Sequence, residues 1–90
     1  MATLKLPALL KYYVDNRSEV ELNGETLADA LTDLTTRYPT FKTHLVDSSG
    51  NLRRHVNFFV NEQNIKDLNG LQTALSPEDK IILIQSISGG

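Results

Sequence analysis

The chain has 90 residues, of which 40% are hydrophobic and 22% charged, and its formal net charge at pH 7 is −2. This composition is typical of one soluble domain with a small core and without a deep catalytic cleft, and it excludes a strongly basic nucleic-acid surface. The chain has no cysteine, which excludes disulfides, thiolate metal sites and a cysteine nucleophile. Neither a membrane-spanning segment nor a signal-peptide pattern is present, so we expect a cytoplasmic protein.

The first part of the chain predicts two short strands around an ambiguous segment. Thr3–Leu6 and Glu19–Leu22 alternate polar and apolar residues, as half-buried strands do, and Pro7 limits the first of them. Ala8–Asn16 fits either a helical turn or a packed loop. The pair Asn23-Gly24 then predicts a turn.

A helix is predicted between Thr26 and Pro39. The Thr26 hydroxyl is suited to cap its start, and Pro39 disfavours helical geometry in the residue before it, so the helix ends there. Asp33 and Arg37, four residues apart, lie on the polar side. The apolar residues recur at three-to-four spacing and need a sheet to cover: Leu27, Ala30, Leu31, Leu34 and Tyr38.

The second half predicts three more strands after a loop that holds one helical turn. The loop covers Thr40–Asn51, and the helical turn is placed at Phe41–Leu45. The strands are placed at His55–Asn61, Asn64–Lys66 (a short edge strand) and Lys80–Ile87. In the first of these strands, Val56, Phe58 and Val60 share one face, and we expect that face to pack against the helix.

The last strand is apolar on both faces from Ile81 to Ile84, which is typical of a strand at the centre of a sheet. The predicted order is strand, strand, helix, strand, short strand, strand. With the first and last strands side by side, this order gives the β-grasp arrangement, a mixed sheet crossed by one main helix in the α+β class.

No conventional active site is apparent in the sequence. His44 and His55 lack metal-ligand spacing to other candidates, so we expect surface residues and no metal site. The acidic residues between Asp15 and Glu25 are expected to form a solvated face. We therefore predict that the domain is not itself an enzyme and binds no cofactor.

The chain ends in Ser88-Gly89-Gly90, directly after the apolar strand. Because glycine has no Cβ, such an end can pass through a channel too narrow for other residues, and its carboxylate is sterically open to attack on a phosphate. Small residues are also common at frayed chain ends, so the pair alone is a weak signal.

Taken together, several features resemble the ubiquitin-fold sulfur carriers over Thr3–Gly90: the β-grasp order, the helix end Arg37-Tyr38-Pro39, the segment Val56–Asn61 and the terminal Gly89-Gly90. This family includes the small subunit of molybdopterin synthase and the carrier that supplies sulfide to a cysteine synthase. The resemblance implies that an E1-like enzyme uses ATP to adenylate the terminal glycine, which sulfur transfer then converts to a thiocarboxylate. It assigns this role to Gly90, and it assigns to Gly89 the role of letting the chain end pass through a narrow channel.

The resemblance favours one branch of this family. The Pro-Pro pair that precedes the tail of molybdopterin-synthase small subunits is absent, and the stretch reads Gln85-Ser86-Ile87. The tract Arg54–Glu62 and the loop Ser48–Arg53 look closer to the cysteine-synthase type. We therefore expect a role in cysteine biosynthesis, with an E1-like adenylating enzyme and a cysteine synthase-like acceptor as partners. The alternatives are a molybdopterin synthase small subunit, which would act with the large subunit, and a ubiquitin-like interaction or conjugation module.

We expect a β-grasp domain over residues 1–84 and a flexible diglycine tail over residues 85–90. By likeness to ubiquitin, Ile81 and Leu83 face the helix. This leaves an apolar patch for partner binding on the open face of the sheet, formed by Phe59, Ile82 and Ile84 and continued by Ile87 and Ser88. The alternative is that Ala8–Val14 folds over the patch and hides it.

Overall fold

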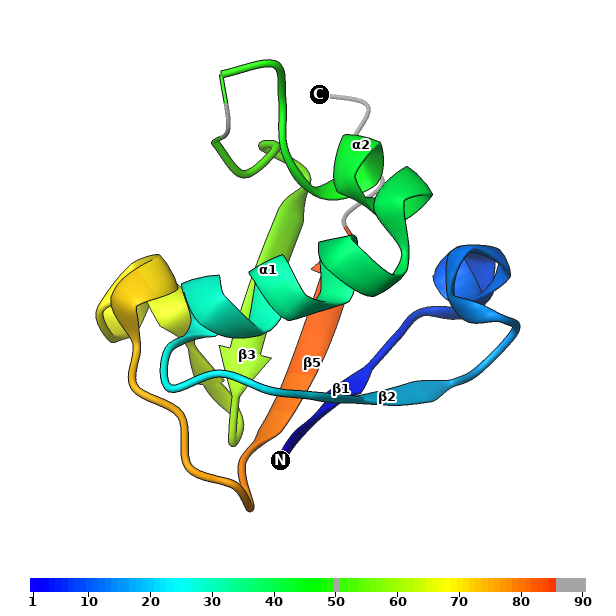
Figure 1. The fold of residues 1–90 in the computed structure, drawn as a ribbon. Coiled ribbons are helices and arrows are strands. Elements are labelled where there is room, and N and C mark those ends of the chain that lie inside the picture. Colours follow the sequence, from blue (N-terminus) through cyan, green and yellow to red (C-terminus); the bar gives the residue numbers. More distant parts are fainter. Residues whose placement is uncertain (50, 86–90) are drawn as a thin grey trace.

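The computed structural model describes residues 1–49 and 51–85, and the statements below concern these residues. Five strands form one sheet in the order β2-β1-β5-β3-β4. Their bounds are β1 (Ala2–Lys5), β2 (Glu19–Leu22), β3 (Val56–Val60), β4 (Gln63–Asn64) and β5 (Lys80–Gln85). The main helix α1 (Leu27–Arg37) crosses one face of this sheet, and the short helix α2 (Lys42–Leu45) lies beside the C-terminal end of α1 (Figure 1). The described residues also form four 3-10 helices, η1 (Ala8–Val14), η2 (Pro39–Phe41), η3 (Ile65–Asp67) and η4 (Gly70–Gln72).

The first and last strands lie side by side at the centre of the sheet. They pair in parallel, with Leu4 opposite Ile81, and β5 pairs antiparallel to β3, with Phe58 opposite Leu83. The outer strand β2 pairs antiparallel to β1. The predicted β-grasp arrangement is therefore confirmed.

Local interactions fix both ends of the turn that leads into α1. The Thr26 hydroxyl accepts a hydrogen bond from the backbone N–H of Asp29 at 3.2 Å, which is the predicted N-cap. Gly24 passes so close to the helix that an added Cβ would lie 2.5 Å from the backbone nitrogen of Ala30. Only glycine therefore allows the turn to approach α1 so closely.

The core lies between α1 and the inner face of the sheet. Leu27 and Leu34 of α1 are fully buried, as are Phe58 and Ile81 on the sheet, while Leu83 is 2% exposed. The predicted inward face of β5, Ile81 and Leu83, is thus confirmed. The other core side chains include Leu4, Val20, Leu22, Ala30, Leu31, Phe41, Leu45, Val56 and Val60.

The ambiguous segment forms η1, which closes the core at the end of α1. Its Leu10 and Val14 are buried, and the Tyr13 ring lies edge-on to Phe41 with ring centroids 6.1 Å apart. This segment contacts η2, and its Tyr13 ring lies against His44 of α2, while Ile84 on the open face is 42% exposed. The alternative in which it hides the apolar patch is therefore wrong.

The predicted edge strand at Asn64–Lys66 is displaced. The strand is β4 at Gln63–Asn64, joined to β3 by the two-residue turn Asn61-Glu62, in which both residues have positive φ, 50° and 71°. This is the type I′ geometry that suits the twist of a hairpin. The chain then leaves the sheet because the Asn64 side chain caps η3, accepting from the Lys66 N–H at 2.9 Å.

The final strand is described as far as Gln85, which pairs with Val56. Gln85, assigned from the sequence to the tail, is therefore the last residue of β5. The rest of the predicted strand and tail, from Ser86 to Gly90, lies outside the described residues.

The neighbouring residues Phe58 and Phe59 provide a matched test of this architecture. Phe58 is fully buried, whereas Phe59 lies on the open face and is half-buried. We expect Phe58→Ala to lower the free energy of unfolding by about 3–5 kcal/mol, and Phe59→Ala to lower it by only about 1 kcal/mol. Denaturant unfolding of both variants measures the difference. Equal losses would show that the assignment of the two faces of β3 is wrong.

Candidate functional site

The C-terminal segment follows β5, the middle strand of the sheet. β5 lies between β1 and β3, so its backbone pairs on both sides through Ile82. Beyond Ile82 it stays paired with β3, up to Gln85 opposite Val56. The last described residues of β5 therefore keep one partner strand, β3.

An apolar patch lies on the open face of β5. Phe59 pairs with Ile82, and Ile84 lies opposite Asn57, so the side chains of Phe59, Ile82 and Ile84 share one face. We call these three residues the sheet patch. Ile84 is 42% exposed, and Phe59 and Ile82 are half-buried. Three of the predicted site residues therefore lie together and are accessible.

Polar groups border the sheet patch. Lys5 lies opposite Ile82 and forms an ion pair with Glu19 of β2, with Nζ and Oε2 3.8 Å apart. Asn57 and Asn64 of β3 and β4 are half-buried on the other side. An apolar centre with a polar rim is the usual anatomy of a protein-binding surface.

The other four predicted site residues cannot be placed in this geometry. Ile87, Ser88, Gly89 and Gly90 lie outside the described residues. Their assignment remains a prediction from the sequence.

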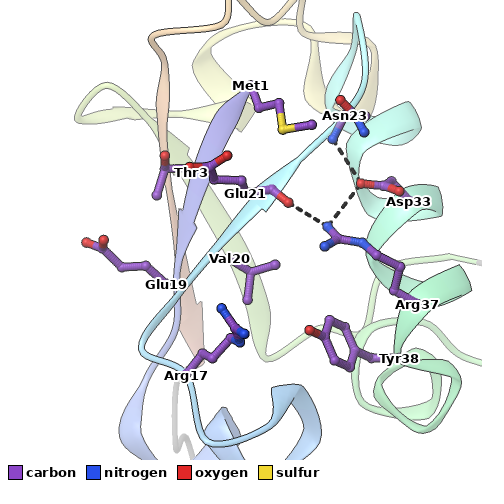
Figure 2. A pocket seen from close by; sticks show the side chains of 10 residues that line it. All are labelled: Met1, Thr3, Arg17, Glu19, Val20, Glu21, Asn23, Asp33, Arg37 and Tyr38. Carbon is purple, nitrogen blue, oxygen red and sulfur yellow. Dashed lines mark hydrogen bonds and ion pairs between the residues drawn. The ribbon is translucent and has the colours of Figure 1, made fainter.

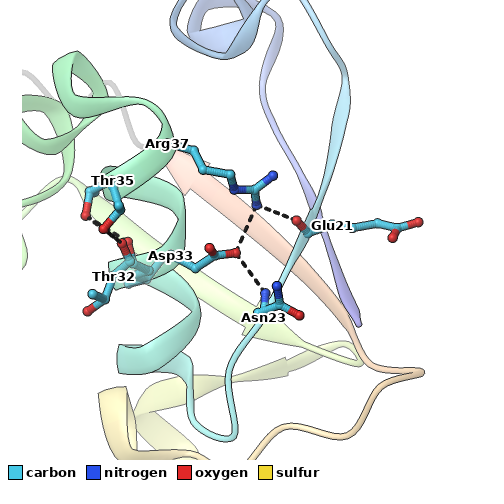
Figure 3. Close-up of polar contacts among 8 residues, drawn as sticks. Glu21, Asn23, Thr32, Asp33, Thr35 and Arg37 are labelled. Carbon is cyan, nitrogen blue, oxygen red and sulfur yellow. Dashed lines mark hydrogen bonds and ion pairs between the residues drawn. The ribbon is translucent and has the colours of Figure 1, made fainter.

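A polar hollow of about 520 Å³ lies between β2 and α1, lined by Arg17, Glu21, Asp33, Arg37 and Tyr38 among others (Figure 2). Two of its charged groups, Asp33 and Arg37, bind one another. The Arg37 guanidinium donates to the Asp33 carboxylate at 3.0 Å and to the backbone carbonyl of Glu21, and Asp33 accepts the Asn23 N–H at 2.9 Å (Figure 3).

These hydrogen bonds tie α1 to the outer edge of the sheet. They occupy the Glu21 carbonyl and the Asn23 N–H on the side of β2 where no strand pairs. Blocking such an edge protects it from pairing with another chain. The sequence predicted only the Asp33–Arg37 pair, because the contact with β2 depends on the tertiary fold.

The histidines and acidic residues do not converge on a reactive centre. His44 is half-buried beside the Tyr13 ring, with centroids 4.2 Å apart. Across the described ranges, no three metal-ligating side chains form a group that suits a metal ion. No helix in the same part of the chain has the length and apolar character to cross a membrane.

The model of the ThiS family matches residues 4–90, nearly the whole chain. The chain belongs to the ThiS family. Membership confirms the resemblance to ubiquitin-like sulfur carriers that was drawn from the strand order, the Val56–Asn61 segment and the diglycine end.

Individual relatives agree with this family assignment. The chain is 30% identical to the sulfur carrier protein CysO of Mycobacterium tuberculosis over 98% of this chain and 97% of that protein. The crystal structure of M. tuberculosis CysO superposes with a TM-score of 0.88 at 28% identity, covering 97% of this chain and all of that one. Small archaeal modifier protein 1 from Methanosarcina acetivorans gives a TM-score of 0.84 at 33% identity, over 99% of this chain and 95% of that one.

A more distant structure supports the fold alone. The Amycolatopsis orientalis BexX/CysO complex contains a chain with a TM-score of 0.90 at 24% identity, with full coverage of both chains. This similarity confirms that the sheet order and the crossing helix are those of a ubiquitin-like β-grasp domain.

Proposed function

We propose that this ThiS-family protein carries sulfur as a thiocarboxylate on Gly90, for use in cysteine biosynthesis. The identity to a sulfur carrier protein along nearly the entire chain carries this proposal. The Gly89-Gly90 pair and the central position of β5 agree with it. In this role the protein is a substrate and carrier, and its partner enzymes perform the catalysis.

The chemistry requires activation because a carboxylate is a poor electrophile. Attack of the Gly90 carboxylate on the α-phosphorus of ATP forms an acyl-adenylate and releases pyrophosphate. A sulfide nucleophile then adds to the activated carbonyl, and AMP leaves to give the thiocarboxylate. The activating enzyme supplies the ATP, so the carrier binds no cofactor, and we assign the reaction to the cytoplasm, where ATP is available.

We propose that the domain extends through Gln85, the last residue of β5, and that residues 86–90 act as the arm that enters partner enzymes. Five extended residues reach at most about 18 Å, which is enough to enter an active site while the globule stays outside. Gly89 leaves the last part of the arm narrow.

The sheet patch is the proposed docking surface for the adenylating enzyme and for the synthase that accepts the sulfur. Ile84 lies on the strand that leads into the arm, so docking there fixes where the arm begins. We propose that Ile87 and Ser88 extend the same contact along the partner.

A second candidate is covalent attachment to other proteins. The 33% identical relative from Methanosarcina acetivorans is named a small archaeal modifier protein, which favours this alternative. Both roles begin with the same adenylate. They differ in the nucleophile, which is a lysine amine for conjugation and sulfide for sulfur transfer.

The C-terminal chemistry is tested by ATP–pyrophosphate exchange with the adenylating enzyme. We expect exchange to fall to background when Gly90 is deleted, when one alanine is added after it, or in Gly89→Val, whose side chain would obstruct the channel. The three variants should unfold at the same denaturant concentration as the native protein, because the core of the described chain ends at Leu83. Exchange by the extended chain at the native rate would refute the carrier role.

Docking is tested by comparing two exposed aliphatic residues. Ile84 belongs to the sheet patch, whereas Leu9 is 71% exposed on η1. We expect Ile84→Ala to raise the KM for the carrier about tenfold, equivalent to about 1.4 kcal/mol, with little change in kcat. Leu9→Ala, the matched control, should leave both constants unchanged. Equal effects of the two substitutions would show that the patch is not the docking surface.

A further inference from the structure

A hollow of about 500 Å³ lies beside α1, on the side of the helix away from Asp33 and Arg37, which face β2. A second hollow of about 330 Å³ adjoins it, and both are lined by Leu52 and Leu71. We call the joined hollows the α1 groove. None of the three sheet-patch residues lines it, although Asn57, at the border of the sheet patch, lines the second hollow.

One half of the α1 groove is apolar. Leu31 and Leu45 are buried at its base, and Val46, Leu52 and Leu71 are half-buried along it. The hydroxyls of Thr32, Thr35 and Thr36 donate to carbonyls of their own helix at 3.0, 3.0 and 2.7 Å, so they need no hydrogen bond from a ligand. This half therefore suits aliphatic side chains.

The other half of the α1 groove is basic. Arg53, Arg54 and Lys66 line it, Lys42 lines the apolar half, and neither hollow has an acidic lining residue among the described parts of the chain. The ion pairs among residues 1–49 and 51–85 involve Lys5 and Arg37, and none of these four. The Arg53 Nε donates to the Thr43 carbonyl at 2.7 Å, which holds its side chain at the groove.

The acidic residues nearest in sequence, Asp47 and Asp67, form no ion pair with these four basic residues in the described ranges. The Asp47 carboxylate accepts the backbone N–H groups of Ser49 and Asn51 at 2.9 and 3.1 Å, and Asp67 follows Lys66 in η3. The α1 groove thus presents local positive charge on a chain whose net charge is −2.

We propose that the α1 groove binds an acidic, amphipathic segment of a partner protein. Aliphatic side chains of the segment pack on Leu52 and Leu71, and its carboxylates face Arg54 and Lys66. A nucleic acid fits less well, because the lining has no aromatic side chain on which a base can stack.

The α1 groove lies close to the point where the C-terminal segment begins. Val56 lines the basic half and also lies opposite Gln85, where the C-terminal segment begins. A partner in the α1 groove therefore sits beside the start of that segment and leaves the sheet patch free. One protein can hold the domain through the groove while an enzyme docks on the sheet. The proposal does not depend on the sulfur-carrier role.

The test is an NMR titration of the full ¹⁵N-labelled chain with a synthetic helical peptide of leucine and glutamate. We expect saturable shifts at the amides of Leu52, Arg54 and Leu71, and an affinity that falls as salt is added. Arg54→Glu or Lys66→Glu should raise the Kd about tenfold or more, equivalent to about 1.4 kcal/mol. Lys80→Glu, which makes the same charge change on an exposed lysine at the start of β5, should leave it unchanged.

Four results would overturn the proposal. Shifts centred on Ile82 and Ile84 would assign the peptide to the sheet patch. Equal binding of a leucine-lysine peptide, of oligoglutamate without leucine, or of single-stranded DNA would show that the groove does not select acidic amphipathic chains. Shifts at Leu52 and Leu71 that grow with protein concentration alone would identify a second copy as the occupant. Absence of saturable shifts at millimolar peptide would also exclude the proposed contact.

Discussion

The parallel pairing of β1 with β5 is the constraint on which the rest of the structure depends. It joins the two ends of the described chain at the centre of one sheet, with Leu4 opposite Ile81. Two parallel strands need a connection that crosses the sheet, and α1 lies on that connection and covers the inner face. The remaining strands then complete the sheet, with β2 beside β1 and β3 beside β5.

This central position gives β5 two roles on two faces. Ile81 and Leu83 are buried under α1 and support the core, whereas Ile82 and Ile84 lie on the open face. The strand then leads directly into the C-terminal residues. In the proposed function, stability, docking and the start of the arm therefore depend on one strand, although alternate residues separate these roles.

Local patterns predicted much of the fold. The helix followed from its apolar spacing, the Thr26 cap and Pro39, and the two faces of β3 followed from strict alternation. Both signals lie within a few residues of chain. The inward face of β5 was different, because Ile81–Ile84 is apolar throughout, and only the resemblance to ubiquitin chose between its two faces.

The features that the sequence did not predict depend on tertiary contacts or unusual turns. The β3–β4 turn uses Asn61-Glu62 in a conformation that usually recruits glycine, so its position was not evident. The contact of Arg37 with β2, and the meeting of α1 with Leu52 and Leu71, join residues far apart in sequence. Alternation placed Phe59 on the face of β3 away from Phe58, whereas Ile82 and Ile84 were assigned to the sheet patch through the resemblance to ubiquitin. The roles of Gly89 and Gly90 rest on the sequence and the family.

Intact mass spectrometry tests the central claim most directly. The native protein is incubated with the adenylating enzyme, ATP and a sulfide source, beside the same chain without Gly90. We expect a species heavier by the exchange of one oxygen atom for sulfur, only with ATP and only in the chain that ends in Gly90. An unchanged mass, or the same increase in the chain without Gly90, would contradict it.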